Sequence, residues 1–224
     1  DPAFNESEFA DKVAGRYRTN HRVETVVSDD YDLVDTLARL YDEPYADSSA
    51  IPTYRVSQLA RKHVTVALSG DGGDELFGGY NRYAITRRFW RTIAAIPRPL
   101  RALAARSLTA ISPSAWNSAG AMLQPVIPRN MQVRLLGDKV HKGAGVLASR
   151  SIDDVYHGVA SHWREPEQLV LGSREPPTPL TGAAPRLAGL NDVERMMAID
   201  LLSYLPDDIL VKVDRASMAV SLES

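Results

Sequence analysis

A glycine-rich segment at residues 69–75 carries the residue types best suited to chemistry in this sequence, Ser-Gly-Asp-Gly-Gly-Asp-Glu. Its glycines permit backbone angles that other residues avoid and let a ligand approach the main chain. Asp71 and Asp74 are hard oxygen donors, and Mg²⁺ is typically held by one or two carboxylates together with phosphate oxygens. Because carboxylates and phosphates repel each other unless a divalent cation lies between them, the segment predicts a magnesium–nucleotide site. The competing interpretation is an acidic surface turn.

Two strands and several helices are expected to position this turn. Residues 64–68 form a short apolar run bounded by turn signals, which is typical of a strand buried on both faces. Residues 21–27 are β-branched and partly alternating, so they predict a second strand. Apolar spacing between these segments predicts helices beginning near Ser28 and Thr53. This order predicts a parallel α/β sheet, whose ligands collect at the carboxyl ends of strands, and a helix start after the turn would favour phosphate.

The pattern becomes helical beyond Tyr80, with prolines and glycines separating the helices. Residues 164–190 are rich in Pro and Gly and predict a surface loop or lid. Asn191 is a plausible cap for a helix reaching Tyr204, and Pro206 is expected to open the last helix. The sequence thus predicts an α/β part at residues 1–85, a helical region at 86–190 and C-terminal helices at 191–224 that pack on the active-site cleft.

The composition of the 224 residues is that of a globular chain, with 44% hydrophobic and 24% charged residues. No apolar run approaches the roughly 18 residues that span a bilayer, so no membrane partner is expected. The absence of cysteine excludes thiolate chemistry and fits a cytoplasmic location. Residues 76–151 hold twelve basic residues and one acid, but their arginines lack clustered aromatic partners. We therefore expect solvated or docked helix faces and no nucleic-acid partner.

Two separated stretches resemble the asparagine synthetase family. They are Val66–Tyr80 (VALSGDGGDELFGGY) and Tyr204–Ala219 (YLPDDILVKVDRASMA). Asp42–Pro44, Asp47 and the helix at Tyr54–Ala60 are also similar to the family, and the resemblance is weakest at residues 100–190. It implies an α/β fold of the adenine-nucleotide α-hydrolase (ATP-pyrophosphatase) type, with a partial parallel sheet followed by a mostly helical region.

The resemblance also implies a reaction and a set of site residues. Members use Mg²⁺ and ATP to adenylylate the side-chain carboxylate of aspartate, and ammonia then displaces AMP to give asparagine. That ammonia comes from glutamine hydrolysed in a separate glutaminase domain, which is not in this chain. A homodimer is expected for the full-length protein. Asp71 matches an acidic residue tied to adenylate formation, often a glutamate in the family, and Asp74 matches the magnesium-binding aspartate. The positions expected to contact ATP are Leu68, Ser69, Gly70, Gly72 and Gly73.

Lys212 lies in the second stretch, four residues after Asp208. One interpretation is an ordinary helix ion pair between these two side chains. The other, suggested by the resemblance, is that the helix lines the synthetase cleft with Lys212 or Asp214 near the substrates, and we take Lys212 as a candidate catalytic residue.

Two parts expected of a complete synthetase are not in the 224 residues. These are the pyrophosphate-binding serine-glycine-glycine loop, expected to precede Asp1, and the glutaminase domain with its cysteine. The chain alone is therefore expected to have no synthesis activity. Two alternatives stay open: a related amidotransferase or β-lactam-forming synthetase acting on another carboxylate, and a non-catalytic nucleotide-binding module. Asp71 argues against the β-lactam branch, which tends to place a tyrosine there.

Overall fold

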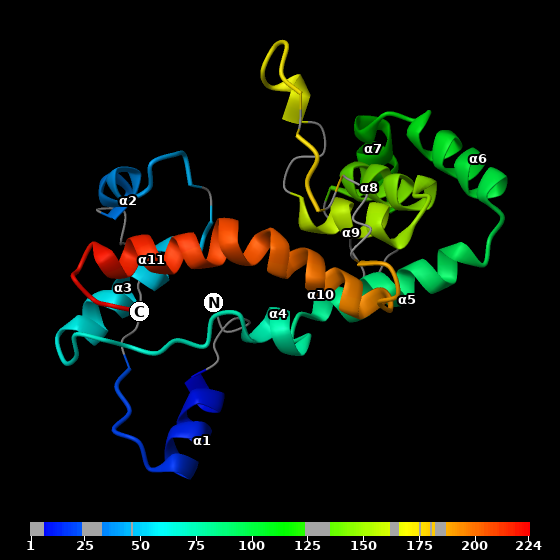
Figure 1. Ribbon diagram of the computed structural model, residues 1–224. Helices are drawn as coiled ribbons and strands as arrows, with labels where there is room; N and C mark the ends of the chain where they lie inside the picture. Colours follow the sequence, from blue (N-terminus) through cyan, green and yellow to red (C-terminus); the bar gives the residue numbers. More distant parts are fainter. Residues whose placement is uncertain are drawn as a thin grey trace. The chain divides into compact units, whose positions relative to one another are not determined.

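The computed structural model describes residues 7–23, 33–45, 47–123, 135–161, 166–174, 176–179, 181 and 187–224 (Figure 1). These residues are mainly helical. The helices are α1 (Ser7–Tyr17), α2 (Val34–Leu40), α3 (Ala50–Arg61), α4 (Gly73–Phe77), α5 (Asn81–Ala94), α6 (Arg98–Thr109), α7 (Pro113–Leu123), α8 (Leu136–Ala148), α9 (Ile152–Ala160), α10 (Asp192–Leu202) and α11 (Leu210–Met218). A 3₁₀ turn at Pro166–Gln168 and a π-helical turn at Leu205–Ile209 complete the regular structure of the described part.

The predicted parallel sheet of the ATP-pyrophosphatase type is wrong for the residues that the structure describes, which contain no strand. Val66 forms only an isolated parallel bridge with Glu223. Val64, Val66 and Leu68 are exposed, Leu68 completely, rather than buried on both faces. A β-branched apolar run is suited to packing in a sheet, but it does not supply the neighbouring strands that its backbone groups need. Residues 21–23 of the other predicted strand are irregular, and residues 24–27 lie outside the described residues.

The chain divides into two compact units. The first unit comprises residues 1–69 with 208–224, and the second unit comprises residues 70–207. This division reflects which residues pack together. The three parts expected from the sequence, residues 1–85, 86–190 and 191–224, were distinguished by their expected structure and role, and that division stays a prediction.

In the first unit, α11 packs against α3. Ala216 of α11 and Ala50 of α3 are both buried, and small side chains let the two helices approach closely. Tyr41, just after α2, is also buried and stacks on Tyr45 with ring centroids 4.1 Å apart. The Tyr41 hydroxyl donates to the Lys212 carbonyl at 3.4 Å, so the segment after α2 is joined to α11.

The core of the second unit lies among α5, α9 and α10. It is formed by Tyr83, Ile152, Tyr156, Leu187, Met196 and Ile199. The predicted cap at Asn191 is confirmed, because its side chain accepts from the backbone N–H groups of Val193 and Glu194. The predicted helix start near Ser28 lies outside the described residues.

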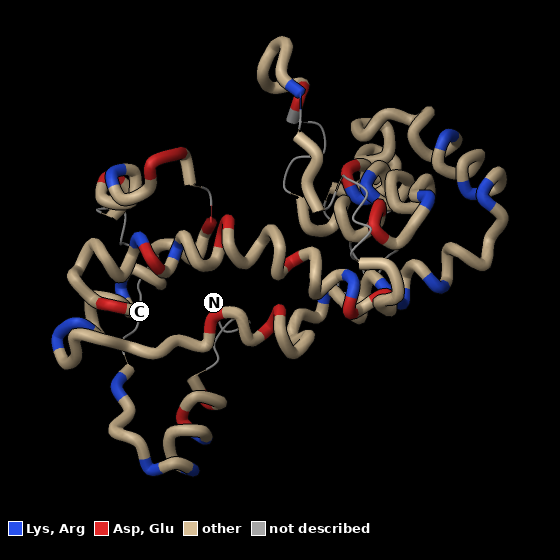
Figure 2. Tube along the Cα trace, in the orientation of Figure 1, with Lys and Arg blue, Asp and Glu red and all other residues tan. Residues whose placement is uncertain are grey.

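The basic block predicted from the sequence falls on several helices of the second unit, and Figure 2 shows its charges along α5 and α6. Arg88, Arg91 and Arg98 are exposed, as expected of solvated faces. Arg101 is instead buried, and its guanidinium donates to the carbonyls of Ile96 and Ser149. No helix in the described part is both long and apolar enough to cross a bilayer.

Candidate functional site

The glycine-rich turn is a tight, left-handed entry into α4. Gly72 has φ +84°, which strongly favours glycine, and it is buried beneath Leu205. The Gly73 N–H donates to the Gly70 carbonyl at 3.1 Å, and the Leu76 N–H donates to the Gly72 carbonyl at 3.0 Å. The predicted conformational role of Gly72 is thereby confirmed.

The two predicted acidic residues of this turn are exposed. Asp74 lies in the first turn of α4, and its carboxylate is folded against Gly79. A Cβ atom on Gly79 would collide with Asp74 Oδ1, so glycine at position 79 makes room for this carboxylate. The Gly79 N–H also donates to the Asp74 carbonyl at 3.0 Å, which closes the α4 segment into a compact loop.

The donor set of the turn fits a magnesium ion that arrives with its nucleotide. Among the described residues no group of three or more His, Cys, Asp or Glu side chains could hold a metal by itself. Two exposed carboxylates suit Mg²⁺, since this ion commonly takes one or two carboxylates and completes its shell with phosphate oxygens and water. A helix does begin directly after the turn, at Gly73, as predicted, but α4 has only five residues, and the phosphate preference expected of that helix start stays a prediction.

Lys212 is buried in the first unit, with 8% of the residue exposed. Its Nζ atom donates to Asp47 Oδ2 at 2.6 Å and to Ser49 Oγ at 2.7 Å. Asp208 does not pair with Lys212 and instead accepts a hydrogen bond from the Tyr45 hydroxyl at 2.7 Å. The expected helix ion pair between positions 208 and 212 is therefore replaced by contacts to a segment more than 160 residues earlier.

This environment shifts the pKa of the Asp47 carboxyl. Burial acts to raise its pKa, but hydrogen bonds from Lys212 and from the Ser49 N–H and hydroxyl outweigh burial. The pKa of Asp47 is consequently lowered from 3.8 to about 2. Burial, followed by the hydrogen bond to Asp208, raises the pKa of the Tyr45 hydroxyl, which therefore remains a donor.

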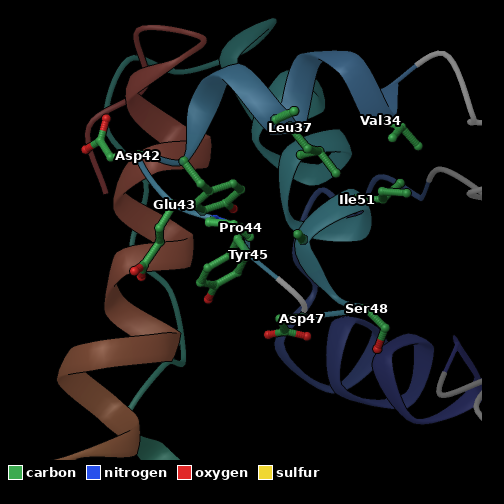
Figure 3. Close-up of a pocket in the computed structure, with 12 residues that line it drawn as sticks. Val34, Leu37, Asp42, Glu43, Pro44, Tyr45, Asp47, Ser48 and Ile51 are labelled. Atoms are coloured by element: carbon green, nitrogen blue, oxygen red, sulfur yellow. The ribbon is translucent and has the colours of Figure 1, made fainter. Parts of the chain in front are cut away.

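A pocket of about 640 Å³ lies beside these residues in the first unit. Figure 3 shows Val34, Leu37 and Ile51 along one side of it, with the carboxylates of Glu43 and Asp47 away from that side. Its size lies in the range of pockets for small ligands, and its walls combine apolar side chains with a few carboxylates. The pocket is lined by two tyrosines and three carboxylates, and the sequence alone did not predict it.

The whole chain, residues 1–224, matches the family model described as asparagine synthase. The chain belongs to the asparagine synthase family. It is 33% identical over 226 residues to a putative glutamine-hydrolysing asparagine synthetase of Mycobacterium tuberculosis (strain H37Rv), covering 98% of this chain and 31% of the relative. It is also 31% identical over 191 residues to the glutamine-hydrolysing asparagine synthetase 1 of Bacillus subtilis, covering 82% of this chain and 26% of the relative. No solved structure matches significantly.

A shorter match within the asparagine synthase family has a higher sequence identity than these two. The putative glutamine-hydrolysing asparagine synthetase 2 of Methanocaldococcus jannaschii is 46% identical over 78 residues, covering 34% of this chain and 15% of the relative. This chain spans less than a third of the length of each of these relatives.

The residues expected to act in an asparagine synthase fall into both units. Gly70, Asp71, Gly72, Gly73 and Asp74 lie together in the second unit. Leu68, Ser69 and Lys212 belong to the first unit, where Leu68 and Ser69 are exposed. The roles of all eight residues in ATP binding or catalysis stay predictions.

Sequence reasoning missed the partners of Lys212. Asp47 was recognised as resembling the family, but nothing in its spacing indicated an ion pair with a residue 165 positions later. The Tyr45 contact to Asp208 was missed for the same reason, since it joins residues 163 positions apart. The one signal in the sequence was that the segment with Asp47 and the stretch with Lys212 both resemble the same family.

Replacing Lys212 with methionine is expected to destabilise the first unit by about 2–3 kcal/mol at pH 7, because Asp47 then lies mostly buried without its cation. The folded pKa of Asp47 lies below its unfolded value, so the stabilisation is present above pH 3.8 and is lost as the pH falls to about 2. Thermal unfolding between pH 7 and pH 2 should show the difference from wild type shrinking within that window.

Arg215→Met is the matched control for this measurement. Arg215 lies on the same helix as Lys212 and pairs with Asp42, but the side chains of Arg215 and Asp42 are substantially exposed, at 43% and 78%. This variant should therefore change stability little at any pH. A Lys212→Met effect that is equally large at pH 2 and pH 7 would contradict the role given to the ion pair.

Proposed function

We propose that this chain contributes the aspartate-activating part of an asparagine synthetase, which forms asparagine from aspartate, ATP and glutamine-derived ammonia. The observation that carries the proposal is the left-handed glycine turn with Asp71 and Asp74 exposed on it, in a chain whose residues 1–224 match the family model. The proposal extends to a cytoplasmic location and to homodimer formation by the full-length protein.

The reaction proceeds in two steps. A side-chain carboxylate oxygen of aspartate attacks the α-phosphorus of ATP, the new P–O bond forms, and the bond to the bridging oxygen breaks to release pyrophosphate. Ammonia then attacks the acyl carbon of the aspartyl-adenylate. The C–N bond forms, the C–O bond to AMP breaks, and ammonia loses a proton to give the amide.

The residues of this chain have distinct proposed roles in these steps. Asp74, with Asp71 beside it, would hold Mg²⁺, which lowers the repulsion between the carboxylate and the phosphates. Leu68, Ser69, Gly70, Gly72 and Gly73 would line the path of the nucleotide, and the exposed main chain at Ser69 and Gly70 would allow close approach of its phosphates. Asp71 orients the aspartate during adenylate formation, and Lys212 supplies positive charge, for which it would have to share its contacts with Asp47 and Ser49.

The test is pyrophosphate release from ATP by the full-length protein with a panel of carboxylate acceptors. We expect release that depends on aspartate and yields AMP and asparagine when glutamine or ammonia is supplied. Release only with a different carboxylate would point to the related amidotransferase, and no nucleotide binding would point to a non-catalytic module. The 224-residue chain assayed alone is expected to release no pyrophosphate, because it lacks the serine-glycine-glycine loop.

A further inference from the structure

Glu75, the residue after Asp74, is held in an unusual environment for a carboxyl side chain. It is 1% exposed, although α4 otherwise presents Asp74, Leu76 and Phe77 to solvent. Its Oε1 atom accepts a hydrogen bond from the Tyr80 hydroxyl at 2.6 Å. Burial, followed by this hydrogen bond, raises the pKa of the Tyr80 hydroxyl, so Tyr80 remains protonated and donates.

Tyr80 is in turn held by Arg82. The guanidinium carbon of Arg82 lies 4.1 Å from the centroid of the Tyr80 ring and 4.7 Å from that of Tyr204. A cation over an aromatic face at these distances is attracted to the ring, and the attraction is stronger where water is excluded. The position of the Tyr80 ring therefore depends on where Arg82 is fixed.

Arg82 is fixed by Asp200 of α10. Arg82 Nη2 lies 2.5 Å from Asp200 Oδ2, and Asp200 is 1% exposed. The same oxygen accepts from the hydroxyls of Tyr83 at 2.7 Å and Tyr156 at 2.6 Å. Three donors on one buried oxygen leave Asp200 little freedom, so it is a rigid anchor for Arg82.

This series of contacts ends at the candidate metal ligand. An isolated helix of five residues has little stability of its own, so the direction of α4 depends on its tertiary contacts. Asp74 and Glu75 are adjacent on α4, and rotation of one about the helix axis necessarily moves the other. The buried end at Glu75 thereby sets where the Asp74 carboxylate points, above Gly79.

We propose that Tyr80 and Arg82 are positioning residues that orient the Asp74 carboxylate through the buried Glu75 side chain. Because it concerns Asp74 as a magnesium ligand, this role rests on the proposed function. All of its contacts lie within the second unit. The series predicts that loss of one hydroxyl at Tyr80 weakens metal–nucleotide binding without removing any ligand.

Tyr80→Phe in the full-length protein tests this role. Outer partners that orient a metal ligand typically contribute 10- to 100-fold to metal affinity or activity, and we expect about a 10-fold rise in the Mg²⁺ concentration that half-saturates pyrophosphate release. The Kd for Mn²⁺ in the presence of ATP, measured by electron paramagnetic resonance without turnover, should rise by a similar factor. Glu75→Gln, which keeps a weaker acceptor for Tyr80, should shift both quantities in the same direction by a smaller factor.

Ser151→Ala is the matched control. It removes the N-cap hydroxyl of α9 in the same unit, which accepts from the Asp154 N–H at 3.2 Å and is not part of the series from Asp200 through Arg82 and Tyr80 to Glu75. It should lower the Tm while leaving Mn²⁺ binding and the Mg²⁺ requirement unchanged.

The outcomes separate this role from the proposed function. If wild type releases pyrophosphate with aspartate but Tyr80→Phe and Glu75→Gln bind Mn²⁺ as well as wild type, the positioning role is overturned and the function stands. If wild type binds Mn²⁺–ATP and only the Tyr80 and Glu75 variants weaken it, the positioning role stands even when aspartate supports no turnover. If wild type does not bind Mn²⁺–ATP at all, both are overturned.

Discussion

Asp74→Asn in the full-length protein is expected to lower aspartate-dependent pyrophosphate release by about 10³-fold. The substitution removes the charge of the carboxylate that is proposed to hold Mg²⁺ while the carboxylate of aspartate attacks the phosphate. Asp74 is exposed, so the fold should hardly change. The rate of pyrophosphate release at saturating ATP and aspartate is the measurement, accompanied by thermal unfolding to show that the variant is folded.

Asp138→Asn provides the control for that loss. Asp138 is also an exposed acid in the first turn of a helix, α8, and it is remote in sequence from the glycine turn. Its removal should leave the rate within about two-fold of wild type, since exposed substitutions away from a site have small effects. Retention of more than a tenth of wild-type activity in Asp74→Asn would remove Asp74 from the proposed magnesium site.

Asp200→Ala is expected to destabilise the second unit by about 4 kcal/mol. The side chain is the shared acceptor for Arg82, Tyr83 and Tyr156, so its loss leaves a partly buried guanidinium without its counter-ion and two buried hydroxyls without their acceptor. Stability of this unit should be followed by urea unfolding at pH 7. Asp200→Asn retains the shape and one acceptor oxygen, so its cost should be clearly smaller.

The Arg195–Asp153 pair supplies a matched comparison within the same unit. Arg195 and Asp153 are joined at 2.7 Å, but each side chain keeps 27% of its surface exposed. Asp153→Ala should therefore cost about 1 kcal/mol or less. Equal costs for Asp153→Ala and Asp200→Ala would show that the buried network around Asp200 contributes no more than a partly exposed ion pair.

The glycine turn was predictable because its chemistry is local. The left-handed backbone at Gly72 and the exposure of the two aspartates follow from residue types within a few positions. The cap at Asn191 was predictable for the same reason, since its partners are two and three residues away.

The sheet could not be judged from the same local evidence. Residues 64–68 have the composition of a buried strand, but a strand exists only where a neighbouring segment receives its hydrogen bonds. In the described residues Val66 finds only Glu223, 157 positions later, and its side chain stays 55% exposed. The apolar pattern of residues 64–68 therefore indicated a preference for strand conformation, but whether a strand forms depends on pairing with a neighbouring segment.

The two polar networks were also hidden from sequence reasoning. Asp200 meets Arg82 and Tyr83 across 118 and 117 positions, and Lys212 meets Asp47 across 165. No periodicity links residues that far apart. These networks became visible only when the fold brought α10 to α5 and α11 to the segment after α2.

The most direct test of the central claim is the fate of oxygen during turnover. The full-length protein is supplied with ATP, ammonia and aspartate labelled with ¹⁸O in its side-chain carboxylate, and the AMP formed is analysed by mass spectrometry. If the aspartate carboxylate is adenylylated, each AMP carries one ¹⁸O atom, because the C–O bond breaks when ammonia attacks. AMP without the label, or ADP in place of AMP, would contradict the assignment of this chain to an aspartate-activating synthetase.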